Sequence, residues 1–297
     1  WLQTITPGDY ITNHLSLGRI YLPTSSYDEM GEWVMPAEES YELTHLKHQL
    51  QAEGQGHIAR FMRGGLWRQF MVKYEEVNQL HKKALLVSQK VNRMRPGPAK
   101  DTALDHLWAG QCNCGYWHGV FGGIYLFHIR EADYRHLIAA ENIADGLEST
   151  PPKPFVRAEL IDFDRDADDD AIISTDRQSL IFDSDRGGAL TEWDFRPANY
   201  NLLNVLTRRR EGYHRQLEEA AAVNAVVTPD STPKGDAPES IHSETVRARE
   251  AGLEQKLFYD WHRKASFLDH FFNEAVGLDS FDRAQLGERG DFVNQPY

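Results

Sequence analysis

The residues best suited to chemistry are concentrated between positions 109 and 125. Five glycines in this stretch permit positive φ angles or close backbone approach. Between them stand side chains that offer stacking faces and hydrogen-bonding groups, namely Gln111, Cys112, Asn113, Cys114, Tyr116, Trp117 and His118. This combination predicts one wall of a ligand pocket. The plainer alternative is a tightly packed loop that is rich in glycine and aromatic residues.

Two other kinds of chemistry are open to the same stretch. His106, Cys112, Cys114 and His118 could form a zinc site, because two thiolates and two imidazoles complete a tetrahedral ligand set. The Cys-x-Cys spacing makes simultaneous ligation awkward, however. A nucleophilic cysteine could use one of the two histidines as its base, but the sequence supplies no third group to orient that base.

A second cluster contains aspartates at positions 162, 164, 166, 168, 169 and 170. Alternating carboxylates on a loop gather hard oxygen ligands around calcium, as in the first half of an EF-hand loop. We therefore predict that Asp162, Asp164, Asp166 and Asp170 bind a structural calcium ion. The glycine and the distal glutamate of an EF-hand are missing, so a solvated acidic loop is the alternative. No other cofactor is required.

Composition limits the class of protein. The 297 residues, 41% of them hydrophobic, suffice for two domains with a sizeable core. A net charge of −13 argues against nucleic acid or an anionic membrane as partner, and no apolar run approaches the ~20 residues of a spanning helix. The two cysteines are too close for an ordinary structural disulfide, which favours a cytoplasmic location. Because the chain opens at Trp1 rather than Met, we expect it to be a piece of a longer polypeptide.

The elements that would position these residues follow from hydrophobic spacing. Val77, Leu80, Ala84 and Val87 recur at intervals of three and four, which predicts an amphipathic helix. Similar reasoning predicts a stripe of core residues at Met62, Trp67, Phe70 and Met71. The helices expected in the first half are 7–15, one that begins after Pro36, 66–74, 77–91, 101–108 and 130–144. Residues 19–22 predict a buried strand, and a polar loop follows as far as residue 33.

The pattern changes after the prolines at 151–154, which mark a domain boundary. Residues 189–195 alternate with a period of two, and 171–173 and 180–182 are short buried runs, so a β-sandwich is expected. Helices are predicted at 201–223 and 245–257, a mobile loop at 224–244, and an incomplete strand at 291–294.

The string Gln-Cys-Asn-x-x-Tyr-Trp-His-Gly-Val-Phe-Gly-Gly-x-Tyr at 111–125 resembles the last signature region of glycoside hydrolase family 57, in its 4-α-glucanotransferase and α-amylase branch. Five further strings, at 18–33, 63–67, 78–82, 187–192 and 263–270, also resemble that family and occur in the same order. The resemblance covers most of the chain.

The resemblance implies an α+β chain in three parts. Residues 1–36 would be the end of an incomplete (β/α)₇ barrel, 37–150 a helical bundle that carries the signature region, and 151–297 the N-terminal part of a β-sandwich. Members of the family are retaining enzymes on α-glucans, and retention requires a nucleophilic Glu and an acid/base Asp. The family places both on barrel strands N-terminal to these residues, so the chain alone is expected to be inactive.

The resemblance also implies a substrate-binding role for the opening stretch. Trp117 falls on the family's substrate-contacting tryptophan, and Cys114 stands where the family often has an Asp that contacts sugar. The other candidate contacts are Asn113, Tyr116, His118, Trp33 and Glu32. The expected partners are an α-glucan or maltooligosaccharide and the N-terminal barrel, with homo-oligomer formation left open. The alternative function is a non-catalytic carbohydrate-binding or structural module.

Overall fold

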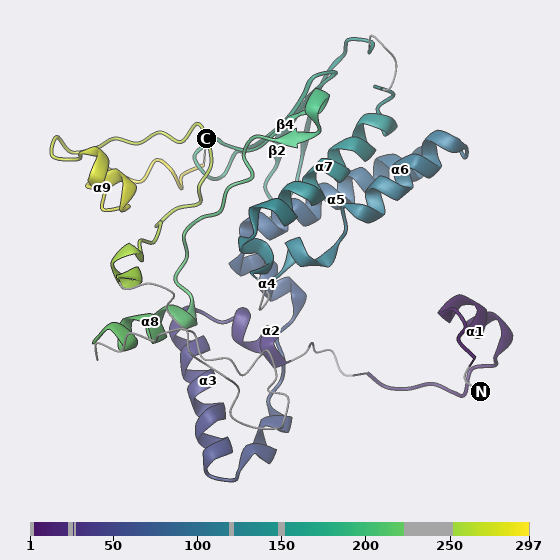
Figure 1. The fold of residues 1–297 in the computed structure, drawn as a ribbon. Helices are drawn as coiled ribbons and strands as arrows, with labels where there is room; N and C mark the ends of the chain where they lie inside the picture. The colour runs from purple at the N-terminus through teal and green to yellow at the C-terminus, as the bar shows by residue number, and fades with distance from the viewer. Residues whose placement is uncertain are drawn as a thin grey trace.

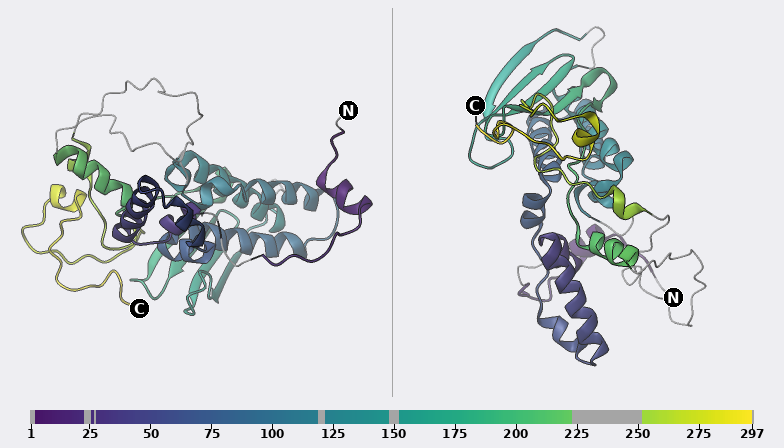
Figure 2. Two further views of the ribbon diagram at one scale, coloured as in Figure 1. Left: turned by 90° about the horizontal axis from the view of Figure 1, so that it is seen from below. Right: turned by 90° about the vertical axis from the view of Figure 1, so that its left-hand side faces the viewer.

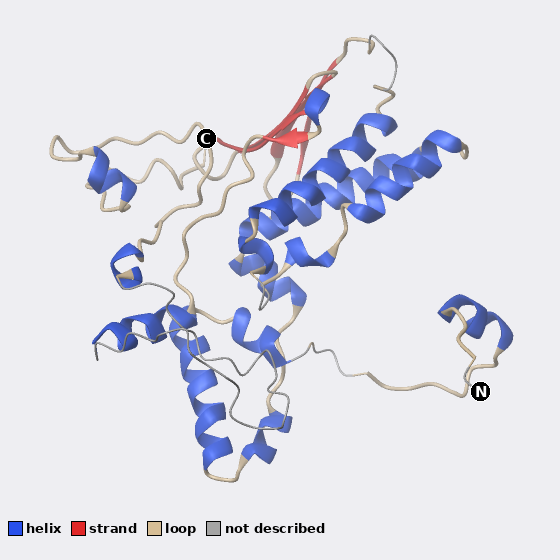
Figure 3. Cartoon of the chain, viewed as in Figure 1, coloured by secondary structure: helices blue, strands red, loops and turns tan. Residues whose placement is uncertain are grey.

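The computed structural model describes residues 3–22, 26, 28–118, 122–147, 152–222 and 252–296. Helices dominate the first half, and a five-stranded antiparallel sheet follows them, so the predicted α+β class is confirmed (Figures 1 and 3). Within the described ranges, the chain has no helix that combines the length and the apolar character needed to cross a membrane.

The N-terminal segment stands apart from the rest of the chain (Figure 1). Helix α1 (Pro7–Asn13) begins where the Thr6 hydroxyl accepts a hydrogen bond from the Asp9 amide, and every residue from 3 to 22 is exposed. The buried strand predicted at 19–22 is therefore wrong in this structure: Ile20 is 81% exposed, and no described strand pairs with it. The loop predicted to end at residue 33 is instead helical from 28 onward, as α2 (Asp28–Trp33).

The helices predicted from hydrophobic spacing are confirmed with shifted ends. They are α3 (Ala37–Ala52), α4 (Trp67–Lys73), α5 (Glu75–Arg93), α6 (Pro98–Ala109) and α7 (Phe127–Ala144), with a short 3₁₀ turn, η1 (Gly56–Phe61), after α3. Helices α5, α6 and α7 pack against one another as a bundle (Figure 1). Helix α3 buries no residue, although its leucines recur at helical spacing.

The core lies inside this bundle. Phe70, Val87, Leu137 and Ile138 are fully buried, and the three-four spacing along α5 does place its apolar side chains inward. Of the predicted stripe, Phe70 and Met71 belong to the core and Trp67 packs against it. Burying such side chains contributes about 1.5–3 kcal/mol each, so this cluster stabilises the whole helical half.

The sheet is an antiparallel meander in sequence order. Its strands are β1 (Val156–Ile161), β2 (Asp170–Thr175), β3 (Gln178–Asp183), β4 (Ala189–Phe195) and the short β5 (Tyr200–Asn201). Strands β2 to β4 were predicted and β1 was not, because its side chains are mostly exposed. Ile172 and Ile181 lie opposite each other and pack with Phe163 against Leu86 of α5, so one face of the sheet covers the bundle (Figure 2). The described strands form one sheet, one layer of the expected sandwich.

The contact between sheet and bundle is ionic as well as apolar. Lys83 of α5 is completely buried, and its Nζ lies 2.7 Å from Glu141 Oε2 of α7. It lies 2.6 Å from Asp194 Oδ2 and 3.1 Å from Glu192 Oε1, both on β4. Burial by itself would lower the pKa of Lys83, but the three carboxylates outweigh burial and raise that pKa well above its ordinary value. The ammonium is therefore charged.

The remaining predictions for the C-terminal half were less accurate. The helix predicted at 201–223 is helical only in α8 (Gly212–Ala222), because β5 and an extended segment occupy its first part. The loop at 224–244 and most of the helix at 245–257 lie outside the described residues; η5 (Leu253–Lys256) is the described end. Residues 291–294 form a turn and not a strand. Helix α9 (Leu278–Asp282) lies in the C-terminal segment, which meets the sheet at an isolated bridge between Leu190 and Ser266.

Candidate functional site

The described parts of the glycine-rich stretch, residues 109–118 and 122–125, lie between α6 and α7. Two 3₁₀ turns, η2 (Asn113–Tyr116) and η3 (Gly123–Tyr125), lie on either side of Trp117. The Ile124 amide donates a hydrogen bond to the Trp117 carbonyl at 2.8 Å. Gly123 has φ +49°, and a Cβ atom there would lie 2.2 Å from the same carbonyl oxygen. Only glycine lets the loop close this tightly around Trp117.

Three of the predicted wall residues meet although they come from distant parts of the chain. Trp33, at the end of α2, has its ring centroid 5.8 Å from that of Trp117, in an edge-to-face arrangement. The ring of His118 lies 5.5 Å from Trp33. All three side chains are partly buried, so packing restrains the rings while part of their surface stays accessible. Aromatic pairs of this geometry contribute about 0.5–1.5 kcal/mol beyond their burial.

Asn113 and Cys114 lie on the exposed side of the loop. The Cys114 thiol is 3.7 Å from Asn113 Oδ1, as a weak donor. Burial, and then the neighbouring Cys112, raise the pKa of Cys114, so the sulfur is protonated at neutral pH. A nucleophilic cysteine would need the thiolate. The two residues instead offer uncharged hydrogen-bonding groups.

Tyr116 lies in the core beneath the loop. It is 5% exposed, and its hydroxyl donates to the Gly110 carbonyl at 2.6 Å. No face of its ring is open to a ligand, so we leave Tyr116 out of the wall. Glu32 is occupied in a different way, because its Oε1 is 2.7 Å from the Lys47 ammonium on α3.

The four residues of the zinc alternative do not form a ligand cluster in the described part of the chain. His106 Nδ1 lies 2.9 Å from Nδ1 of His136, and His118 packs among aromatic rings. Across the described ranges, the groups that bring three potential ligand atoms within 4.8 Å of one another consist of aspartates and contain neither cysteine nor histidine.

A buried carboxylate behind the wall was missed from the sequence. Glu211, just before α8, accepts a hydrogen bond from the Tyr74 hydroxyl at 2.6 Å and one from the Tyr125 hydroxyl. Lys73 Nζ lies 3.1 Å from its other oxygen. Burial would raise the pKa of Glu211, but Lys73 and the hydroxyls lower it, so the group is ionised. Tyr125 in turn lies edge-on to the His118 ring at 5.2 Å, and Glu211 therefore supports the wall from behind.

This arrangement can bind a ligand but has no evident catalytic pair. Its exposed parts are aromatic faces and neutral hydrogen-bonding groups, which suit an uncharged molecule with an apolar face. Two carboxylates near the wall, Glu32 and Glu211, are each paired with a lysine. Burial lowers the pKa of His118, which keeps its ring neutral at physiological pH.

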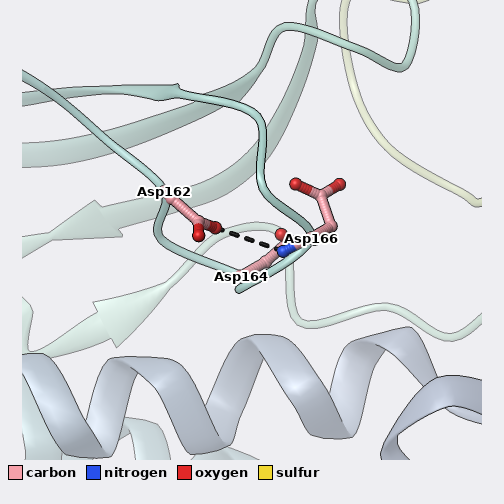
Figure 4. A group of neighbouring side chains, drawn as sticks. All are labelled: Asp162, Asp164 and Asp166. Atoms are coloured by element: carbon pink, nitrogen blue, oxygen red, sulfur yellow. Dashed lines mark hydrogen bonds between the residues drawn. The ribbon is translucent and has the colours of Figure 1, made fainter.

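The aspartate loop brings together three of its four predicted ligands. Carboxylate oxygens of Asp162, Asp164 and Asp166 come within 4.8 Å of one another, and the Asp166 amide donates to Asp162 Oδ1 at 3.1 Å (Figure 4). Burial, followed by the charge of Asp166, raises the pKa of Asp164 to about 6. Asp170 is placed differently, because its Oδ2 accepts the amides of Phe163 and Asp164.

A second acidic trio was not predicted. Asp185, at the end of β3, joins Asp166 and Asp168. Its distance along the sequence hid it, although the antiparallel pairing of β2 with β3 brings the two loops to the same end of the sheet. Calcium binding by the loop stays a prediction.

Comparison with known proteins places the chain. Residues 65–144 match the model of the middle domain of the α-amylase/4-α-glucanotransferase family, and residues 162–297 match that of its C-terminal domain. The chain therefore belongs to the α-amylase/4-α-glucanotransferase family, as the resemblance of its motifs predicted.

Individual relatives agree with this assignment. The chain is 40% identical to α-amylase 1 of Dictyoglomus thermophilum over 94% of its own length, and 33% identical to the 4-α-glucanotransferase of Thermococcus litoralis over 100%. The crystal structure of the latter superposes with a TM-score of 0.71 at 32% identity, over 99% of this chain and 39% of that one. The chain spans only 38% and 41% of the lengths of these two relatives, and it corresponds to a C-terminal portion.

Proposed function

We propose that this chain supplies part of the substrate-binding wall of a retaining α-glucan-active enzyme, an α-amylase or a 4-α-glucanotransferase. The catalytic Glu and Asp would lie N-terminal to it, on a (β/α)₇ barrel that covers the wall from the other side. The observation that carries the proposal is the convergence of Trp33, Trp117 and His118 on one partly open aromatic surface, in a chain of this family.

The geometry of the wall suits a glucosyl ring. A sugar presents an apolar face that stacks on an aromatic ring and a rim of hydroxyls that need hydrogen-bond partners. Trp117 offers the ring, in edge contact with Trp33, and Asn113 offers an exposed amide from the turn that precedes Trp117. Because Cys114 is a neutral thiol, it provides weaker hydrogen bonds than the Asp that is frequent in the family, so sugar affinity at this position should be reduced.

Two incompletely covered apolar surfaces support the proposal that the chain belongs to a larger assembly. The apolar residues Ile20, Tyr21 and Leu22 are exposed in an extended segment, as expected of a strand that pairs elsewhere. On the sheet face turned away from the bundle, Ile173, Leu180 and Trp193 are only partly covered, which agrees with a sandwich completed by a second sheet. The domain boundaries at 36 and 150, and homo-oligomer formation, stay predictions. The free Cys112 and Cys114 support a cytoplasmic location.

Replacing Trp117 by Ala in the intact protein tests the proposal. Loss of the stacking surface should weaken maltoheptaose binding by about 1–3 kcal/mol and lower kcat/KM accordingly. Trp108→Ala is the matched control, because Trp108 is 61% exposed on α6 and packs against none of the wall residues given above.

Binding is measured by calorimetry and turnover by the release of oligosaccharides. An unchanged kcat/KM in Trp117→Ala would contradict the role of the wall. If the intact protein bound maltoheptaose through Trp117 but neither hydrolysed nor transferred it, the non-catalytic carbohydrate-binding module would be the correct reading.

A further inference from the structure

A second cavity lies away from the aromatic wall. It has a volume of about 250 Å³ and is open to solvent on one side. Its lining comes from the start of α5, the facing ends of β3 and β4, and the segments 207–209, 260–268 and 293–294. Trp33, Trp117 and His118 do not line it. Its walls come from both matched regions of the family, the middle domain and the C-terminal domain. Ligand sites form preferentially at such seams between domains.

Two arginines in this cavity are anchored on one side and open on the other. Arg209 holds Glu76 with Nη1 at 2.7 Å, while its Nη2 is 3.9 Å from Glu75. Arg263 donates from Nη2 to Gln79 at 3.2 Å, while its Nη1 is 3.8 Å from Asp183. A guanidinium has five N–H donors in a rigid fork, so each anchor fixes the orientation of the remaining donors.

The gaps of 3.8 and 3.9 Å are too wide for a direct hydrogen bond. A hydroxyl group placed beside each pair can accept from the guanidinium and donate to the carboxylate at ordinary distances. Both pairs line the same cavity, so one ligand with several hydroxyl groups can reach both of them. This is the recognition chemistry of a polyhydroxylated molecule.

An aromatic face completes the set. Trp261 lines the cavity and is 43% exposed, and the ring of His262 meets it edge-on with centroids 5.0 Å apart. A partly exposed indole held in this way can stack on the apolar face of a sugar ring. The volume leaves room for one monosaccharide ring.

The charges in the cavity do not favour an anion. Each of its four basic side chains already faces a carboxylate: Lys73 faces Glu211, Arg186 faces Glu75, Arg209 faces Glu76 and Arg263 faces Asp183. Burial raises the pKa of Asp183 to about 8, so at neutral pH that group is mostly a neutral acid and only the charge of Arg263 is left over. One uncompensated charge is too few to balance a doubly charged phosphate group. A neutral ligand requires no such compensation.

We propose that this cavity binds a glucosyl unit of an α-glucan, separately from the Trp117 wall. Trp261 supplies the stacking face, and the Arg209–Glu75 and Arg263–Asp183 pairs bind the ring hydroxyls. The ligand class rests on the proposed function, whereas the existence of a neutral-sugar site rests on the cavity itself. Such a site would bind a glucan chain at a second point and so raise the affinity for long chains.

The test is calorimetric titration of the intact protein with maltotriose. We expect two sites in the wild type and in Trp108→Ala, and one site in Trp261→Ala. The affinity of the lost site should fall at least about tenfold. Arg263→Lys is the second variant, because a lysine keeps the charge but lacks the rigid planar fork that reaches from Gln79 toward Asp183. It should lose the same site, and circular dichroism and the melting temperature establish that each variant is folded.

The outcomes separate the two proposals. Wild-type binding in both Trp261→Ala and Arg263→Lys overturns the cavity site, and so does displacement of maltotriose from it by inorganic phosphate. If Trp117→Ala leaves binding and turnover unchanged while Trp261→Ala removes a site, the proposed function of the wall fails and the cavity site stands. Absence of any maltotriose binding overturns both.

Discussion

Asp133 is the most poorly compensated acidic residue near the wall. It is 2% exposed on α7, and within the described ranges its Oδ2 has no hydrogen-bond partner. Burial raises its pKa to about 8. A Cβ atom at Gly115 would lie 2.1 Å from that oxygen, so the wall loop closes directly over the carboxyl group. At neutral pH the group is mostly a neutral acid beneath the loop.

We predict that Asp133→Asn stabilises the protein at pH 8 and has little effect at pH 4. The folded-state pKa is raised above the unfolded value of about 3.9, so the folded state binds the proton more tightly. The stability that this contributes is complete below about pH 4 and is lost as the pH rises through about 8. Asparagine carries no charge to bury, and the gain at pH 8 should be about 1–3 kcal/mol.

Denaturant unfolding of both proteins at the two pH values measures this difference. Asp105→Asn is the control, because Asp105 is exposed on the adjacent helix α6. An equal effect of Asp133→Asn at pH 4 and pH 8 would show that the carboxyl is not the cause.

At the residue scale, the sequence identified side chains whose neighbours are local or belong to a recognisable string. Trp117 and Trp33 were both named, and they meet. Glu211 was not named, because its partner Tyr125 is 86 residues away and nothing in the string around Glu211 distinguishes it from an exposed glutamate of a helix. Tyr116 was named as a contact, because spacing alone does not reveal which aromatic side chain turns inward.

At the scale of elements, the ionic part of the contact between α5 and β4 centres on one lysine. Lys83 neutralises carboxylates from two elements, and the surrounding charges include Lys90 and Arg196, which also reach Glu141. Burying this group of charges is costly, and it is tolerated only while each is paired. Removing one partner therefore costs more than the loss of a single contact.

We predict that Lys83→Met destabilises the folded protein by about 3–5 kcal/mol, because it leaves Glu141, Glu192 and Asp194 without their shared cation. Lys82→Met is the matched control on the next, partly exposed position, and it should cost less than about 1 kcal/mol. Chemical denaturation gives both values. Adding Glu192→Gln and Asp194→Asn to Lys83→Met should recover part of the loss; no recovery would refute the electrostatic explanation.

The aspartate loop offers another prediction at this scale. If it binds calcium, millimolar calcium should raise the melting temperature by a few °C, because an ion that binds only the folded state adds RT ln(1 + [L]/Kd) to its stability. Asp162→Asn should abolish the shift, and magnesium should produce a smaller one. No shift with calcium, together with no heat of binding, would leave a solvated acidic loop.

Elements were predictable where their own side chains build the core. The periodicity of α5 and α7 is complete in the sequence, because these helices bury one face against each other. On β4 the buried Glu192 and Asp194 face Lys83, and hydrophobic alternation does not reveal that contact. Strand β1 lacks that signal because it is mostly exposed and is fixed by backbone pairing with β2. The apolar run at 19–22 has the composition of a strand, but within the described residues no strand pairs with it.

At the scale of the whole molecule, the family and the α+β class followed from strings and periodicity, whereas the relative placement of bundle and sheet did not. That placement is decided by long-range contacts such as those from Lys83 to β4, from Gln79 to Glu192 and from Asn78 to the Asp164 carbonyl. Each joins residues 86 or more positions apart. Nothing local in the sequence encodes such pairings.

The buried ion pairs between sheet and bundle also determine how the two halves can move. At a purely apolar interface two elements can slide past each other gradually, because one apolar contact replaces another at little free-energy cost. Here a shift of β4 by one residue would move Asp194 by about 3.4 Å along the strand and break its ion pair with Lys83. The buried charges would then be unpaired, which is costly. The ion pairs therefore favour a single relative position of the sheet and the bundle. Any ligand that contacted both halves would therefore bind two surfaces at a constant separation.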